Sequence, residues 1–335
     1  MTPPRLLLCG NLGGTNIGES FLAAAGQIGC ESRVVETSRA FTGPKLVRQL
    51  TWHLLGRRPP VLLRYNRWVR AELEQFRPDL LLTTGVCPVT AETLISAGKQ
   101  GIRTANYSTD DPWNPAHRTR RFLRSVPVYD LVFTPRRANY YDFIRVRARE
   151  VRYLPFGYDP RFWFRVPMQP STERPDVLFV GGADRDRIPL LRALVQARFR
   201  VRIHGSYWDR DAVTRSVWAG QVGPDELRSA TCAAEVNLIL VRRANRDGHV
   251  MRSFEAAACG GCLLVEDTPE HREIFADTVT YFRTKGEMTD QMRGLLDDPD
   301  RRGRLAEASH RRVTAGARNT YAQRLRTILE RAFPT

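Results

Sequence analysis

The amino-acid sequence predicts an α/β protein with two Rossmann-like domains that face each other across a cleft. At 335 residues the chain is long enough for two domains of roughly 150 residues each. Short apolar runs alternate with amphipathic segments, as in parallel sheets covered by helices. The pattern also restarts, because an apolar run leads into glycine at RLLLCG (5–10) and again at DVLFVGG (176–182). We therefore predict an N-terminal domain over 1–160 and a C-terminal domain over 161–335.

The apolar runs of the first half predict six strands, and the amphipathic segments between them predict helices. The strands are expected within 5–10, 32–37, 78–85, 102–111, 129–135 and 151–157, and the helices over 19–29, 64–76, 89–99 and 136–145. The loop Gly10–Gly18 after the first strand is rich in glycine. The strand that begins at Ile102 runs into a polar loop, STDD.

The second half follows a Pro- and Ser-containing linker, MQPSTERP (168–175). Strands are predicted within 176–182, 200–205, 234–240 and 261–267, and helices over 187–198, from Pro224, over 251–259, from Pro269 and over 300–332. Thr268 and Pro269 mark a helix start, because threonine caps a helix and proline suits its first position.

Composition places the chain among ordinary globular proteins, with 42% hydrophobic and 26% charged residues. Its apolar runs are far shorter than the roughly 20 residues of a membrane span, and the N-terminus lacks the pattern of a signal peptide. We expect the protein to stay in the cytoplasm. The six cysteines are scattered, as reduced core cysteines are, and Cys259–Cys262 has no second pair with which to bind zinc.

The net charge of +16 is concentrated in the first half. Residues 1–165 hold 25 Lys/Arg against 13 Asp/Glu, whereas residues 166–335 hold 27 against 23. The excess is either a solvated basic surface or a surface that attracts phosphate. We expect anionic membrane or a lipid-diphosphate acceptor to meet it, around Arg118, Arg120, Arg121 and Arg124. Nucleic acid is the least favoured partner, because no base-stacking aromatic pattern accompanies the basic residues.

The segment DGHVMRSFEAAACGGCLLVED (247–267) carries the strongest functional signal. A loop enters a short helix near Val250, a glycine pair ends the helix, and a buried strand follows. The start of a helix presents unpaired N–H groups and a positive dipole end, which suit a diphosphate. Arg252, in the first turn, would add charge-assisted hydrogen bonds to the same phosphates.

Glu255 lies one turn further along this helix. A carboxylate that accepts hydrogen bonds from two vicinal hydroxyls is the usual way to hold a ribose. The same charge can instead serve only the positive end of the helix dipole. The residues alone leave both interpretations open.

The segment SFEAAACGGCLLVED (253–267) resembles the nucleotide-binding signature of GT-B retaining glycosyltransferases of the glycosyltransferase 4-like group. It is especially similar to the branch of CgeB-like spore maturation proteins, whose pattern is similar to R-x-F-E-x-x-A-C-G-G. LPFGYDPRFW (154–163) resembles the interdomain hinge of that group, and VRIHGSYW (201–208) its glycine corner. The resemblance covers about 155–330. Over 1–150 it rests on the glycine loop and on Asp-Asp-Pro at 110–112.

The resemblance implies a nucleoside diphosphate sugar as donor and no metal or other cofactor. Glu255 takes the late glutamate of an E-x7-E motif, which holds the ribose. The early glutamate falls on Asp247, one methylene shorter, where the family contacts the donor sugar. Arg185 or Arg187 corresponds to the basic residues that clamp the diphosphate, and His249 is a weaker candidate for contact with the donor.

Two further groups of residues in the first half are candidates for chemistry. Gly13 and Gly14 would let the backbone approach a donor phosphate, although a glycine pair also suits a simple turn. Asp110 and Asp111 end a strand, where they would bind an acceptor sugar or act as a base; either could instead cap the next helix. His117 is a weaker candidate nearby. Asp184-Arg185-Asp186 spells a D-x-D metal motif but lies in a different loop, so we expect solvated charge there.

The predicted function is transfer of a sugar from a nucleoside diphosphate sugar to an acceptor, which is a glycan, a lipid-linked molecule or a small molecule. Retention of configuration follows from the resemblance alone. One alternative is a GT-B sugar-nucleotide epimerase, and another is a non-catalytic protein that binds a polyanion or a membrane. No GxSxG, HExxH or P-loop lysine motif indicates a hydrolase.

Overall fold

The computed structural model describes residues 4–54, 56–167 and 174–334, and most of the predicted linker 168–175 lies outside them. The chain divides into two compact units. Unit 1 comprises Met1–Pro155 with Tyr321–Thr335, and unit 2 comprises Phe156–Thr320. The division falls close to the predicted one at 160, but the C-terminal residues return to unit 1. Both units are parallel α/β sheets covered by helices, so the predicted fold class is confirmed.

Unit 1 contains a six-stranded parallel sheet in the order β2-β1-β3-β4-β5-β6. Its strands are β1 (Leu6–Gly10), β2 (Ser32–Glu36), β3 (Leu80–Thr84), β4 (Arg103–Tyr107), β5 (Leu131–Thr134) and β6 (Val151–Tyr153). Each lies within a run that the sequence predicted as a strand. The central strands are apolar and buried on both faces, as a sheet covered by helices on both sides requires.

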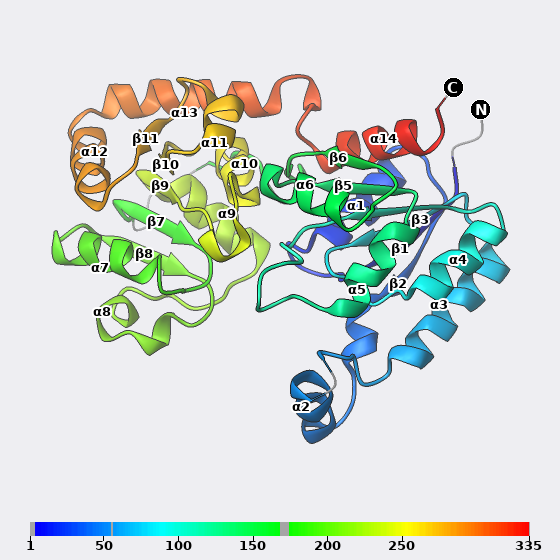
Figure 1. Cartoon of the computed structure of the whole chain (residues 1–335). Helices are drawn as coiled ribbons and strands as arrows, with labels where there is room; N and C mark the ends of the chain where they lie inside the picture. The colour runs from blue at the N-terminus through cyan, green and yellow to red at the C-terminus, as the bar shows by residue number, and fades with distance from the viewer. Residues whose placement is uncertain (1–3, 55, 168–173, 335) are drawn as a thin grey trace. The chain divides into compact units, whose positions relative to one another are not determined.

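The helices of unit 1 connect these strands and cover the sheet (Figure 1). They are α1 (Ile17–Gln27), α2 (Lys45–His53), α3 (Leu62–Phe76), α4 (Ala91–Lys99), α5 (Arg120–Ser125), α6 (Arg137–Arg145) and α14 (Tyr321–Ala332). The sequence predicted α1, α3, α4 and α6, with small differences at their ends. It did not predict α2 or α5, which are short and rich in basic residues.

Unit 2 contains a five-stranded parallel sheet in the order β11-β10-β9-β7-β8. Its strands are β7 (Val177–Val180), β8 (Val201–His204), β9 (Val236–Ile239), β10 (Leu263–Glu266) and β11 (Thr280–Phe282). Its helices are α7 (Ile188–Gln196), α8 (Ala212–Arg215), α9 (Pro224–Ala233), α10 (Met251–Ala258), α11 (Pro269–Phe275), α12 (Lys285–Asp297) and α13 (Pro299–Thr314). Thr268 caps α11 as predicted, its hydroxyl accepting from the His271 N–H at 3.0 Å.

Several features of unit 2 and its end differ from the sequence prediction, and the short helix α8 is one of them. β11 is only three residues long, and α12 follows it where no helix was predicted. The single helix expected over 300–332 is two helices, α13 and α14, with a break near Gly316 at φ +60°. The break lets the chain leave unit 2 and enter unit 1.

Each unit has its own apolar core. All six cysteines are free, and five of them are buried, as expected of reduced core cysteines. Among the described residues, no helix has the length and apolar character needed to span a bilayer.

Helix α14 belongs to unit 1 because it packs on α1 and buries an apolar face there. Leu325 and Ile328 are fully buried, and the Tyr321 ring meets the Phe21 ring edge to face at 5.4 Å. The guanidinium of Arg324, also buried, donates to the Pro155 carbonyl at 2.8 Å. The last helix of the chain therefore completes the core of the first unit.

Replacing Leu325 by alanine should lower the free energy of unfolding by about 2–5 kcal/mol, because it leaves a cavity between α14 and α1. Denaturant unfolding followed by circular dichroism measures the change. Glu330→Ala, on the exposed face of the same helix, is the control and should change little. Equal stability of the two variants would show that α14 does not contribute to the core of unit 1.

Candidate functional site

The carboxyl edge of the unit 2 sheet gathers most of the candidate residues. The loops after β7, β8, β9 and β10 meet there, and α10 begins at the end of the loop that follows β9. This edge is where open parallel α/β sheets bind their ligands. Helix α9 lies beside α10 (Figure 1), and the Arg252 side chain of α10 donates to the Thr231 hydroxyl of α9.

A close backbone approach joins the loops after β7 and β8. Gly181 N–H donates to the His204 carbonyl at 2.9 Å, and Ala183 N–H donates to the Ser206 carbonyl at 2.9 Å. Gly205 has φ +135°, and any Cβ at this position would overlap the Gly181 carbonyl. The buried Trp208 ring also donates its N–H to that carbonyl at 2.8 Å. The glycine corner after β8 is therefore required by packing.

Arg185 and Arg187, the two candidate diphosphate clamps, have opposite environments. The Arg185 side chain is 94% exposed and lies 3.8 Å from the Asp186 carboxylate. The Arg187 side chain is buried and donates to the carbonyls of Gly182 at 3.2 Å and Leu240 at 3.0 Å. Burial, followed by the nearby charge of Arg242, lowers the pKa of Arg187. Arg187 thus ties the β7 loop to the β9 strand end in this structure.

The loop after β9 is shaped by Asp247, the residue in the early position of the motif. Its carboxylate accepts from the Arg242 N–H at 3.3 Å, and its own N–H donates to the Arg242 carbonyl at 3.3 Å. Arg242 is partly exposed, with its guanidinium 3.9 Å from the Asp184 carboxylate. Arg242 was not among the candidates predicted from the sequence, although it lies only three residues after the buried strand β9.

Glu266, at the end of β10, is a second residue of this edge that the sequence analysis missed. Its carboxylate accepts from the Val241 N–H at 3.1 Å and from the Arg243 guanidinium at 3.0 Å. Its position in the apolar strand LLVE is an available signal, because a buried charge is costly unless it has a partner. Glu266 holds the start of the β9 loop against the next strand.

Arg252 and Glu255 are brought together by their spacing of three residues on α10. Arg252 Nη1 lies 3.4 Å from Glu255 Oε2, and both side chains are almost fully buried. The Arg252 guanidinium also lies over the Trp163 ring, 4.9 Å from its centroid. Trp163 and the buried Asp159 come from the segment that resembles the hinge, and both influence the Glu255 carboxylate. Residues 159–163, α9 and α10 therefore form one polar cluster.

Burial dominates the electrostatics of Glu255. It raises the pKa of this carboxyl to about 7, against the lowering effect of Arg252 and a hydrogen bond from Trp163, while Asp159 raises it further. The 3.4 Å separation from Arg252 is long for a charge-assisted hydrogen bond, which explains why the pair does not overcome desolvation. A carboxyl group in a polar cluster whose pKa is raised to about 7 is typical of a functional site.

His249 is fully buried and lies between two packed segments. Its Nε2 accepts from the Phe156 N–H at 3.1 Å, so the proton of the neutral ring lies on Nδ1, 2.6 Å from the Glu270 carboxylate. The ring also contacts those of Phe156 and Phe254. In this structure His249 connects the start of unit 2 to α11, so its two ring nitrogens serve packing within the unit.

Gly13 and Gly14 form the turn after β1, with φ values of +82° and +55°. The Asn16 side chain donates to the Gly13 carbonyl at 2.7 Å, and nothing lies within 4 Å of where a Cβ at either glycine would be. Turn geometry alone is sufficient to require glycine at both positions. The open space beside them is compatible with a ligand as well.

Asp110 and Asp111 have different roles in the loop after β4. Asp111 is buried, and its carboxylate accepts from the Trp113 N–H and the Asn139 amide, both at 2.9 Å. Asp110 is partly exposed, with its carboxylate 3.9 Å from His117 Nε2. Asp111 therefore shapes the loop, and the Asp110–His117 pair presents the accessible polar groups.

Comparisons with known proteins match part of the chain to a family model and the whole chain to a fold. Residues 185–330 match the family model described as "Glycosyl transferase-like". Sucrose-phosphate synthase from Thermosynechococcus elongatus superposes with a TM-score of 0.69 at 13% identity, covering 98% of both chains. The E. coli trehalose-6-phosphate structure bound with UDP-2-fluoro glucose gives 0.64 at 13% identity, covering 99% of this chain and all of that one. The chain has the GT-B fold.

One curated relative also matches part of the chain. Lipid-A-disaccharide synthase of Azotobacter vinelandii is 32% identical over 102 residues, which is 30% of this chain. The matched stretch spans only 26% of that relative's length. The family match includes Arg252, Glu255 and the loop after β9, whereas Asp159 and Trp163 lie before the matched residues.

The raised pKa of Glu255 predicts a pH-dependent effect on stability. The folded-state pKa of about 7 exceeds the unfolded value of 4.5, so the wild type loses stability as pH rises between them. Glu255→Gln cannot ionise, and relative to the wild type it should gain on the order of 2 kcal/mol between pH 5 and pH 8. Urea unfolding at both pH values measures this gain.

Glu330→Gln, on an exposed position, is the matched control and should show no such gain. A Glu255→Gln variant that instead loses stability relative to the wild type as pH rises would show that Arg252 keeps the carboxylate ionised below pH 5.

Proposed function

We propose that this GT-B protein is a glycosyltransferase that moves a hexosyl group from a nucleoside diphosphate sugar to an acceptor. The observation that carries the proposal is the cluster of Arg252 and Glu255 at the start of α10, inside the region that matches the glycosyl transferase-like family. A cation and a carboxyl at a helix start combine the groups that a nucleotide needs, one for phosphate and one for ribose.

The diphosphate of the donor would be bound at the start of α10. In the first turn of this helix the Ser253 N–H donates to the Val250 carbonyl at 3.1 Å, and we assign the N–H groups before it to the ligand. The N-cap, Val250, supplies no capping side chain. Arg252 and the partly exposed Arg242 are the cations that we assign to the phosphates, while Arg187 supports the loop beneath them. These groups would stabilise the charge on the leaving diphosphate.

Donor binding would separate Arg252 from Glu255. Their 3.4 Å contact is weak, so the guanidinium can turn towards phosphate at modest cost. Glu255 would then accept hydrogen bonds from the two ribose hydroxyls, which replace the partner that it loses. The UDP-2-fluoro glucose in the E. coli neighbour supports a uridine diphosphate sugar as the first donor to test.

Unit 1 would hold the acceptor, a glycan, a lipid-linked molecule or a small molecule. We assign the accessible Asp110–His117 pair to an acceptor hydroxyl. Gly13 and Gly14 would let the backbone approach the donor phosphate or sugar closely. The R-x-F-E-x-x-A-C-G-G pattern of α10 supports a retaining enzyme of the CgeB-like branch. We also propose that catalysis needs no metal ion, since arginines and a helix start can neutralise the diphosphate.

The two residues of the cluster should have separable effects on nucleotide binding. Glu255→Ala should weaken a nucleoside and its diphosphate alike, by roughly 1.5–3 kcal/mol, because both ligands contain the ribose. Arg252→Ala should weaken the diphosphate far more than the nucleoside. Isothermal titration with uridine, UDP and UDP-glucose, after a thermal-shift screen over other bases, measures both effects.

Arg293→Ala, an exposed change on α12, is the control and should bind as the wild type does. An Arg252→Ala variant that loses equal affinity for both ligands does not meet phosphate. A Glu255→Ala variant that melts lower but binds nucleotide normally would make Glu255 structural.

Turnover should survive chelation of metal ions and should depend on an acceptor. Release of nucleoside diphosphate from the preferred sugar nucleotide, measured with and without a mixture of glycan and lipid-linked acceptors, tests both points. Loss of turnover with EDTA that Mg²⁺ or Mn²⁺ restores would overturn the metal-independent mechanism. Conversion of the sugar nucleotide to its epimer without an acceptor would show an epimerase instead.

A further inference from the structure

Helix α2 stands out from the rest of unit 1 because its apolar side chains are exposed. It projects from the unit at the end of the loop that follows β2 (Figure 1). Leu46 is 73% exposed, Leu50 55% and Leu54 75%. Their spacing of four residues places all three on one side of the helix. An apolar stripe on a surface helix normally faces a core, whereas this one faces outwards.

Such a helix needs a partner to be stable. Helices shorter than about 12–15 residues are marginal in water, and α2 has only nine. Residues 42–50 are all exposed, so unit 1 itself gives this segment little support. Exposed apolar patches of this kind mark sites of association with another molecule or with a membrane.

The segments around α2 contain all of the excess positive charge of the first half. Residues 37–71 hold eight Lys/Arg and no Asp or Glu, and residues 112–129 hold four Lys/Arg and no Asp or Glu. These twelve cations equal the whole excess of residues 1–165. The basic residues of the first half are thus concentrated in two acid-free segments.

The fold places the two acid-free segments against each other. Arg57 Nη1 donates to the Arg118 carbonyl at 2.7 Å, and Arg121 Nη1 donates to the Gly56 carbonyl at 3.2 Å. Burial lowers the pKa of Arg121, and the charges of Arg58 and Arg124 lower it further. The three cations therefore lie near one another. We call the surface formed by residues 44–54, 56–58 and 118–124 the α2–α5 surface.

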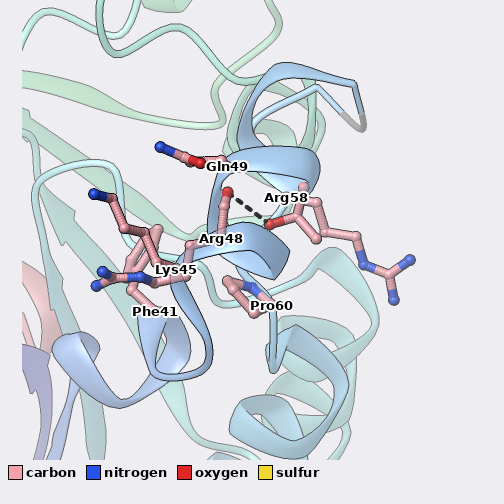
Figure 2. A pocket seen from close by; sticks show the side chains of 7 residues that line it. Phe41, Lys45, Arg48, Gln49, Arg58 and Pro60 are labelled. Atoms are coloured by element: carbon pink, nitrogen blue, oxygen red, sulfur yellow. Dashed lines mark hydrogen bonds between the residues drawn. The ribbon is translucent and has the colours of Figure 1, made fainter.

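A cationic pocket lies beside α2 on the same surface. It has a volume of about 340 Å³ and is lined by Phe41, Lys45, Arg48, Gln49, Thr51, Arg58 and Pro60. Figure 2 shows the charged ends of Lys45 and Arg48 on one side of it and that of Arg58 on the other. Three cations around a small apolar floor match the charge and size of a phosphate head group.

We propose that the α2–α5 surface docks on an anionic phospholipid bilayer, with Leu46, Leu50 and Leu54 inserted among the lipids and the surrounding cations meeting lipid phosphates. An amphipathic helix with an apolar stripe and a basic border lies in the plane of a membrane interface in this way. The cationic pocket receives one head group. Charge complementarity selects the anionic lipid, and the leucine stripe selects a bilayer over a nucleic acid, which offers no apolar interior.

Docking on lipid is separate from the proposed sugar transfer. It uses neither the cluster on α10 nor the Asp110–His117 pair, and it is measured without any nucleotide. A failure of the transferase assay would therefore leave the docking intact, and the reverse also holds. If both hold, docking would bring the acceptor side of the enzyme to lipid-linked molecules.

Co-sedimentation with vesicles tests the proposal. The full chain is mixed with vesicles of phosphatidylcholine alone or with phosphatidylglycerol, at low salt and at 0.5 M NaCl. We expect binding only to the anionic vesicles, reduced at high salt because exposed charges are screened. Lys45→Gln/Arg48→Gln/Arg58→Gln should reduce binding about 100-fold. Leu46→Asn/Leu50→Asn/Leu54→Asn, with unchanged charge, should reduce it on the order of tenfold or more.

A matched control removes the same charge elsewhere. Arg145→Gln/Arg293→Gln/Arg311→Gln replaces three exposed arginines outside the two acid-free segments and should bind as the wild type does. Should a triple variant unfold, Leu50→Asn and Arg48→Gln take its place, since both positions are exposed.

Three results would overturn the proposal. One is equal binding to neutral and anionic vesicles, and another is equal loss in the control variant. The third is wild-type binding by the leucine variant together with displacement of the protein from vesicles by RNA, which would identify the partner as a soluble polyanion.

Discussion

The buried contact between Arg252 and Glu255 is the constraint on which the candidate site depends. Burial disfavours both charges, and the 3.4 Å contact offsets this cost only in part, because the pKa of Glu255 is still raised to about 7. Around this pair, Arg252 contacts Thr231 of α9 and the Trp163 ring, and Asp159 and Trp163 influence the Glu255 carboxylate. The polar residues of one short helix therefore organise three elements that are far apart in the sequence.

The fold could be predicted from the sequence where burial imposes a regular pattern. Strands such as β3, with the letters LLLTT, are buried on both faces and produce unbroken apolar runs. The placement of α14 could not be predicted, since its apolar face fits a core in either unit and only the break near Gly316 sends it to unit 1. β11 was missed because three residues are too few to show a period.

The candidate site was predictable where its contacts are local and unpredictable where they are not. Arg252 and Glu255 are three residues apart on a helix, so the sequence itself places them together. The burial of Arg187 and the connection of His249 to Phe156 depend on residues more than 50 positions away. Arg187 and His249 were candidates for donor contact, and the structure gives both of them internal partners. In both cases the residue type predicted a polar contact, but the packing of distant residues determined which partner the side chain contacts.

The two units differ in how their cations are paired with carboxylates. Unit 2 surrounds its cations with carboxylates, as Asp184 and Glu266 show beside Arg242 and Arg243, so an anion must compete with internal partners for them. Such competition favours a ligand that replaces several contacts at once, which a nucleoside diphosphate can do and a free phosphate cannot. The acid-free segments of unit 1 contain no Asp or Glu of their own to compete for their cations. A surface of that kind attracts anions over a distance of about 10 Å at 0.1 M salt with little selectivity, and the leucines of α2 supply the selectivity that charge lacks.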